Sequence, residues 1–177
     1  MHPRLAELLG YAAAQRAGLL GAVESVPEPR RDRRPAEGVW SVAEVLEHLH
    51  RSESTVASIV STRLAEALAA GLDAEGESGS LLGSLDRFRI PRTVRRVPAP
   101  GFLIPTGVMT WAQALSALAG SREALLQAVA PGDGLALGRV VHPHPILGPF
   151  TLYQWVLFIG QHEARHAAQI RGLAAGT

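Results

Sequence analysis

Two histidines stand four residues apart in the stretch His162-Glu163-Ala164-Arg165-His166, close to the C-terminal end of the sequence. If this stretch is helical, positions i and i+4 share one face of the helix, one turn apart. Two imidazole groups placed in this way can bind one metal ion. The competing interpretation is a pair of polar residues on a solvated face, one of them hydrogen-bonded to a carboxylate.

The same residues match the His-Glu-x-x-His pattern of zinc metalloproteases, in which the glutamate is the general base. We reject that interpretation, because a third ligand is needed downstream and the 11 residues after His166 include no His, Asp or Glu. Gln169 also stands where the longer metalloprotease motif has glycine. A third ligand must therefore come from upstream, and His48 or His50 is the natural supplier.

Three histidines that leave coordination positions open are typical of a catalytic metal site. Imidazole ligands suit Zn²⁺, Ni²⁺, Cu²⁺ or Fe²⁺ better than Mg²⁺ or Ca²⁺.

Composition removes several other classes of chemistry. The 177 residues include no cysteine, which excludes disulfides, cysteine-ligated metal sites and a cysteine nucleophile. All 17 basic residues are arginine, which excludes a lysine Schiff base, and the net charge of +1 gives no general argument for nucleic acid or membrane binding. We find no signal-type segment and expect a soluble cytoplasmic protein. The length favours a single domain over residues 1–177.

Apolar residues at helical spacing predict four helices that would position these histidines. The predicted ranges are Pro3 to Val26, Ser41 to Ala70, Trp111 to Ala130 and Leu152 to Leu173. The last three are each preceded by a capping box, in which a Ser or Thr is followed three residues later by Glu or Gln. These boxes are Ser41 to Glu44, Thr110 to Gln113 and Thr151 to Gln154. Gly71 is a suitable residue to follow the end of the second helix.

The connections between these helices differ in length. The segment from Leu72 to Met109 is very long for a compact domain, and connections of this length are usually functional or locally structured. Within it, Val94 to Val97 or Phe102 to Ile104 could pair briefly as a strand. Pro131 to Pro149 is predicted to be a loop that holds His142 and His144. The fold class predicted is therefore all-α, a four-helix bundle with one long crossover connection between the second and third helices.

Three segments together resemble the DinB-like superfamily. Trp40-Ser41-Val42-Ala43-Glu44-Val45-Leu46-Glu47-His48-Leu49 resembles its second-helix signature. His162-x-x-x-His166-x-x-Gln169-Ile170 resembles its last-helix signature, and the segment from His144 to Thr151 resembles the one that often precedes that helix. The resemblance spans the whole chain. It implies a four-helix bundle, often a homodimer, with a divalent metal held by three histidines.

Carried over residue by residue, the resemblance makes His48, His162 and His166 the metal ligands. His50 does not match a ligand position of the family and is expected at the surface or behind a ligand. Further candidates for orienting a ligand or lining the pocket are Glu44, Gln169 and His144. Glu44 is explained by its capping box, with the orientation of a ligand imidazole as the other possibility. Gln169 could contact the site or bridge two helices, and His144 could line the pocket mouth.

Some charged residues are interpreted as solvated or structural rather than functional. Glu163 lies roughly 100° around the helix from His162, so we expect it to be solvated or at an interface rather than to act as a base. Two arginine runs are interpreted as solvated loops, with an anion or nucleic-acid patch as the weaker alternative. These runs are Arg30, Arg31, Arg33 and Arg34, and then Arg87, Arg89, Arg92, Arg95 and Arg96.

Three functional hypotheses follow. The first is a metal-dependent enzyme that acts on a small-molecule substrate. The metal most expected is Zn or Ni, and as a Lewis acid it would lower the pKa of a bound water or thiol. The resemblance implies two chemistries, transfer of a low-molecular-weight thiol such as bacillithiol or mycothiol, which we favour, and hydrolysis. The second is a non-enzymatic metal-binding bundle in stress response. The third is nucleic-acid binding through the arginine-rich loops. No catalytic residue is identified beyond the metal ligands.

Overall fold

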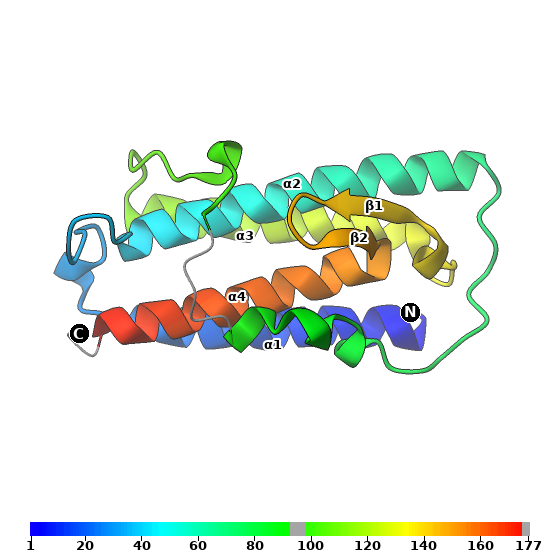
Figure 1. The fold of residues 1–177 in the computed structure, drawn as a ribbon, viewed down its shortest axis with the longest axis horizontal. Helices are drawn as coiled ribbons and strands as arrows, with labels where there is room; N and C mark the ends of the chain where they lie inside the picture. The colour runs from blue at the N-terminus through cyan, green and yellow to red at the C-terminus, as the bar shows by residue number, and fades with distance from the viewer. Residues whose placement is uncertain (93–97, 175–177) are drawn as a thin grey trace.

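The four predicted helices form an elongated bundle (Figure 1). The computed structural model describes residues 1–92 and 98–174. The helices are α1 (Pro3–Glu24), α2 (Val42–Ala69), α3 (Trp111–Val129) and α4 (Leu152–Ala174). α2 packs mainly on α3 and α1 mainly on α4, while α2 also contacts α4. The bundle and the long crossover between α2 and α3 are therefore confirmed.

The long crossover decides the directions of the helices. In Figure 1 the chain leaves α2 at one end of the bundle and returns along its length before α3 begins at the other end. α2 and α3 consequently run in the same direction, and α1 and α4 run in the opposite one (Figure 1). This places the start of α2 and the end of α4 at the same end of the molecule, where the histidines of the two helices can meet.

All three predicted capping boxes are present. The Ser41 hydroxyl accepts a bond from the Glu44 backbone N–H at 3.2 Å, and the Glu44 carboxylate accepts one from the Ser41 N–H at 2.9 Å. The boxes before α3 and α4 have the same reciprocal bonds. Each box satisfies two backbone donors that a helix start leaves unpaired, and so fixes where the helix begins. At the other end of α2, Gly71 adopts φ +79°, a backbone conformation open mainly to glycine.

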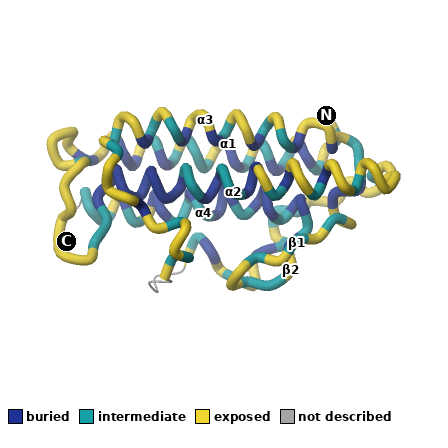
Figure 2. Tube along the Cα trace, turned by 90° about the horizontal axis from the view of Figure 1, so that it is seen from above, coloured by how far each residue is buried: buried dark blue, intermediate teal, exposed yellow. Residues whose placement is uncertain are grey.

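The buried apolar residues form two clusters along the bundle. One contains Leu5, Leu64 and Phe150, and the other contains Leu46 and Leu118. Figure 2 shows the buried positions concentrated on the inward faces of the helices, with the connections largely exposed. None of the helices within the described ranges combines the length and apolarity needed to cross a membrane.

One expectation about the crossover was wrong. Phe102 to Ile104 was a candidate strand, but Gly101–Leu103 forms a 3₁₀ turn, η4, because the Leu103 N–H bonds back to the Pro100 carbonyl at 2.8 Å. The other candidate, Val94 to Val97, lies outside the described residues. The crossover contains two further 3₁₀ segments, η2 (Leu82–Phe88) and η3 (Ile90–Arg92).

The segment before α4, which we expected to be a loop, contains a β-hairpin. Strand β1 (Val141–His144) pairs with strand β2 (Gly148–Thr151) in antiparallel register, Val141 opposite Thr151 and His144 opposite Gly148. Strands this short, each containing a proline, carry too weak an alternation to be recognised from the sequence. The hairpin lies across α2 and α4 (Figure 1) and brings its histidines to the bundle.

Candidate metal centre

α2 and α4 bring three histidines together. His48 Nε2 lies 3.3 Å from His162 Nε2, which lies 3.0 Å from His166 Nε2. The ligand atoms of all three residues lie within 4.8 Å of one another. His162 and His166 meet because they are one turn apart on α4. His50, two residues further along α2, points about 200° round the helix axis from His48, is partly exposed, and has its Nδ1 3.5 Å from the Ser54 hydroxyl.

Hydrogen bonds to the outer ring nitrogens fix two of these imidazoles. His48 Nδ1–H donates to the Leu103 carbonyl at 2.8 Å, and His166 Nδ1–H donates to Gln169 Oε1 at 2.8 Å. A neutral imidazole carries one N–H, so both Nε2 atoms have a free lone pair. Metal-binding histidines are held in this way, because the outer bond sets the tautomer and the direction of the ring.

The trio fits a divalent transition metal. Nitrogen ligands at about 2.0–2.1 Å from a tetrahedral ion are about 3.3 Å apart, which is close to the two distances observed. Without an ion, the single N–H of His162 cannot serve the lone pairs of both His48 and His166. His162 Nδ1 is itself buried and has no hydrogen-bond partner among the described residues. All three donors are imidazole nitrogens, which are borderline ligands that suit divalent transition metals.

Burial keeps these histidines neutral. It lowers the pKa of His48, lowers that of His162 well below the ordinary value, and lowers the pKa of His166 to about 3. The neighbouring imidazoles and the positive charge of Arg165 act in the same direction on His162. A neutral imidazole is the form that binds a metal, so no proton has to be displaced near neutral pH.

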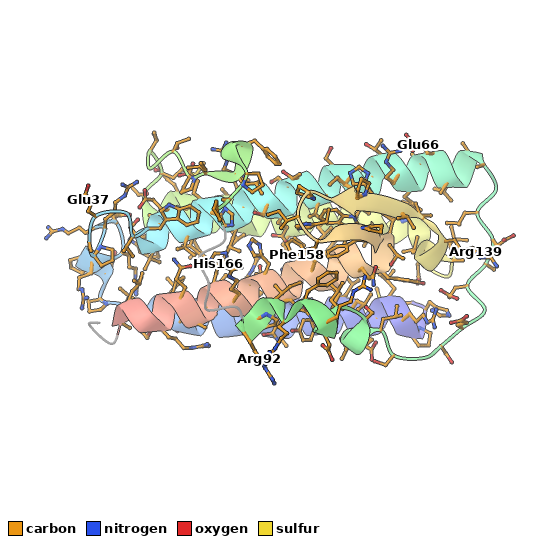
Figure 3. All side chains as sticks on the ribbon, in the orientation of Figure 1. Glu37, Glu66, Arg92, Arg139, Phe158 and His166 are labelled. Atoms are coloured by element: carbon orange, nitrogen blue, oxygen red, sulfur yellow. The ribbon has the colours of Figure 1, made fainter. Side chains whose placement is uncertain are left out.

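A pocket of about 580 Å³ opens beside the trio, and all three histidines line it. Its aromatic lining residues are Trp40, Phe88, Phe102, Trp155 and Phe158. Phe158 and His166, labelled in Figure 3, are two of the α4 side chains at this site. The crossover and the hairpin both contribute to the walls. This gives the segment from Leu72 to Met109 a role, because it carries the Leu103 carbonyl to His48.

The two residues considered for orienting a ligand turn out differently. Gln169 is bonded to His166, as described above. Glu44 does not orient His48, because its carboxylate is occupied by the Ser41 N–H and by the guanidinium of Arg34. The Leu103 carbonyl takes that role instead. No residue type signals it in the sequence, since every residue has a backbone carbonyl.

His142 and His144 both line the pocket. They reach it through the hairpin, in a segment that was expected to be a loop. His144 is half-buried, and burial lowers its pKa to about 4. The structure therefore places His144 in the pocket lining, and its position at the pocket mouth stays a prediction.

Glu163 was expected to be solvated or at an interface rather than to act as a base, and the structure places it at an interface between helices and not in solvent. It is buried, and its Oε1 bonds to Arg16 at 2.6 Å and to Arg122 at 3.0 Å. Both arginines also bond to the buried carboxylate of Glu53. Burial raises the pKa of Glu163, and the two arginines oppose that rise. Since the carboxylate is engaged by these arginines, it is not placed to act as the base of a metalloprotease.

Comparison with known proteins identifies relatives of this chain. The family model described as the DinB superfamily matches residues 11–170. The uncharacterized protein YuaE of Bacillus subtilis (strain 168) is 29% identical over 150 residues, which cover 84% of this chain and 86% of that protein. The crystal structure of TT2238, a four-helix bundle protein, matches with a TM-score of 0.58 at 19% identity, covering 94% of this chain and 97% of the other. At that identity the structural match shows the fold alone.

Proposed function

This chain belongs to the DinB superfamily, and from that premise we propose that it is a metal-dependent enzyme acting on a small molecule. His48, His162 and His166 would hold a divalent transition metal, Zn²⁺ or Ni²⁺ first. The observation that carries the proposal is the convergence of three Nε2 atoms beside an apolar pocket. Among the described residues, this is the one group of metal-binding side chains found.

The pocket favours an enzyme over a purely structural metal site. Structural sites are closed by four protein ligands, whereas catalytic sites keep a position open. A volume of about 580 Å³ lies in the ordinary range for small-molecule sites. When bound, the metal supplies Lewis-acid chemistry and lowers the pKa of a water or thiol in the pocket. Leu103 and Gln169 hold two imidazoles in register, and the aromatic walls exclude bulk water from the substrate.

We favour transfer of a low-molecular-weight thiol over hydrolysis. The chain has no cysteine, so a thiol would be brought in as a co-substrate such as bacillithiol or mycothiol. The thiol sulfur would form a C–S bond to an electrophilic carbon of the apolar substrate. The leaving group would depart with the electrons of its own bond to that carbon, and the thiol proton would pass to solvent. Hydrolysis would place water in the position of the thiol.

Metal content of the purified, untagged protein tests the proposal first. Elemental mass spectrometry should find close to one equivalent of Zn or Ni in the wild type. The variants His48→Ala, His162→Ala and His166→Ala should each lose it, because two remaining ligands bind weakly. His50→Ala is the matched control on α2 and should keep the metal. A wild-type protein that binds no metal even after reconstitution would overturn the proposal.

Two assays on the loaded protein separate the hypotheses. In the first, bacillithiol or mycothiol is mixed with 1-chloro-2,4-dinitrobenzene, and in the second p-nitrophenyl acetate is the substrate. Turnover of the first that is lost in His162→Ala supports thiol transfer, and turnover of the second alone supports hydrolysis. Bound metal with no turnover in either assay favours the non-enzymatic metal-binding bundle.

The remaining alternatives have separate tests. Three arginines of the first run already have partners in the structure, since Arg30 donates to the Leu173 carbonyl, Arg31 lies 4.4 Å over the Trp111 ring and Arg34 is bonded to Glu44. Nucleic-acid binding through these loops would appear as an affinity that falls steeply with salt. A homodimer remains a prediction, which light scattering of the purified protein checks.

A further inference from the structure

His144, the last residue of β1, lines the pocket, and the hairpin turn fixes which of its ring nitrogens is a hydrogen-bond donor. Its Nδ1 lies 3.2 Å from the backbone nitrogen of Ile146 and 3.2 Å from that of Leu147. Both backbone groups are N–H donors, so Nδ1 must be the acceptor. The proton of the neutral ring therefore sits on Nε2. The turn thus fixes the opposite tautomer to that of His48 and His166, whose Nε2 atoms carry lone pairs.

Aromatic rings hold this imidazole in place. It stacks on Trp155 at 5.3 Å between centroids and meets the edge of Phe158 at 4.9 Å. Phe158 in turn stacks on His162 at 5.1 Å. One aromatic ring therefore touches both the donor and the histidine trio. No hydrogen-bond partner of His144 Nε2 occurs among the described residues, and burial lowers the pKa of the ring to about 4, so it stays neutral near pH 7.

The rest of the lining is mostly apolar. Besides the histidines and the indole N–H groups of Trp40 and Trp155, the latter bonded to the His142 carbonyl, its polar side chains are Ser52, Thr55 and Arg165. Aromatic and proline rings supply much of the remaining wall, Pro98, Pro100, Pro143 and Pro145 among them. Apolar pockets with a few placed polar groups bind apolar ligands and orient them through those groups.

Resting on the proposed function, we infer that the pocket takes a flat, neutral, largely aromatic molecule whose acceptor oxygen bonds to His144 Nε2–H. This bond orients the molecule with respect to the histidine trio. The class is an aryl carbonyl compound. An aromatic acid directed to Arg165 is a different ligand, which the experiment distinguishes.

The test compares two ligands of the same shape, 4′-fluoroacetophenone and 4-fluoro-α-methylstyrene, by ¹⁹F NMR titration of the protein as purified. The first has a C=O where the second has C=CH₂, so only the first can accept the bond. The variant His144→Asn keeps an oxygen for the Ile146 and Leu147 amides but has no Nε2–H. His144→Gln carries an N–H near the Nε2 position. His50→Asn, which lies outside the pocket lining, is the control.

We expect His144→Asn to raise the Kd of the ketone about 3- to 10-fold, the value of one hydrogen bond, and to leave the Kd of the alkene unchanged. His144→Gln should recover part of the ketone affinity, and His50→Asn should change neither ligand. An equal change for both ligands, or no change for the ketone, would overturn the inference. So would 4-fluorobenzoate binding more than tenfold more tightly than the ketone, since that would make Arg165 the recognition group.

A second measurement does not depend on the variants. In protein labelled with ¹⁵N-histidine, the Nε2 resonance of His144 should shift on addition of the ketone and not of the alkene. No shift with the ketone would also overturn the inference. Metal content is measured on the same samples. Loss of metal binding with ketone selectivity intact would overturn the proposed function alone, while bound metal without ketone selectivity would overturn this inference alone.

Discussion

The same two helices, α2 and α4, carry two buried polar clusters of opposite character. One is the histidine trio of His48, His162 and His166. The other is an ion cluster, formed by one residue from each helix of the bundle, Arg16, Glu53, Arg122 and Glu163. His162 and Glu163 are neighbours in the sequence but belong to different clusters, because successive residues point about 100° apart around a helix.

The clusters differ in whether their charges are balanced within the protein, although Glu163 Oε2 in the ion cluster has no hydrogen-bond partner among the described residues. In the ion cluster two carboxylates face two guanidinium groups at 2.5–3.0 Å, so charge is balanced within the protein. Ser121 adds a further bond to Glu53 at 2.9 Å. In the trio, lone pairs converge without an opposing charge. The ion cluster holds the four helices together. The histidine trio lacks a positive charge for its lone pairs, and a bound metal ion would supply that charge.

The largest expected effect is the loss of stability caused by a substitution that disrupts the ion cluster. Glu53→Gln leaves two partly buried arginines facing one buried carboxylate, and uncompensated buried charge costs about 3–5 kcal/mol of unfolding free energy. Urea denaturation measures this loss. Glu66→Gln makes the same change at an exposed pair with Arg63 and should cost at most about 1 kcal/mol. Equal losses at both sites would mean that the ion cluster has no special part in stability.

The next effect concerns the histidine trio. Metal at one hundred times its Kd should stabilise the wild type by about 2.7 kcal/mol, because it binds only the folded chain. His162→Ala should show no such gain, while its metal-free stability stays near that of the wild type. Glu53→Gln, despite its lower stability, should gain as much from metal as the wild type. Thermal unfolding with and without Zn²⁺ or Ni²⁺ measures all three, and a metal-stabilised His162→Ala would contradict the assignment.

A smaller effect on metal affinity is expected from a residue that orients one of the trio's imidazoles. Gln169→Leu removes the acceptor of the His166 Nδ1–H, and losses of this kind reduce metal affinity about 10- to 100-fold. Competition with a chromogenic chelator measures the change. Gln127→Leu, at an exposed glutamine of α3 bonded to Glu123, is the matched control and should keep the affinity. Unchanged affinity in Gln169→Leu would limit this glutamine to a structural role.

The smallest expected effect is a pH dependence of stability that arises from His144 in the pocket lining. The folded-state pKa of His144 is lowered to about 4, against about 6.5 in an unfolded chain. Between these values the unfolded chain binds more protons, so stability rises with pH. The contribution is complete above about pH 6.5 and is lost as the pH falls toward 4. In chelator, the wild type should therefore lose more stability between pH 7 and 5 than His144→Asn. Parallel curves in urea denaturation would place the acid sensitivity elsewhere.

Local patterns explain what could be predicted. The capping boxes at Ser41, Thr110 and Thr151 and the glycine at position 71 fix helix ends through bonds or dihedral angles within a few residues. The spacing of His162 and His166 fixes their common face in the same way. Interactions within one turn of helix depend only on neighbours in the chain, which are visible in the sequence.

Features that depend on distant partners were missed. Leu103 bonds to His48 across 55 positions of sequence, and Glu163 is buried because Arg16 and Arg122 arrive from other helices. The β1–β2 hairpin gives no clear alternation in its short strands. In each case the residue type alone is compatible with a solvated position.

By itself the sequence determined the four helices, the long crossover between α2 and α3, and the pairing of His162 with His166 on one face. Only the tertiary structure decided that His48, and not His50, faces them, that the crossover and hairpin wall a pocket beside them, and that His144 lines this pocket with its ring proton on Nε2. The physical reason is the range of the interactions. Helix periodicity and capping act over one turn, whereas the burial, tautomer and pKa of a histidine depend on whatever the folded chain packs against it.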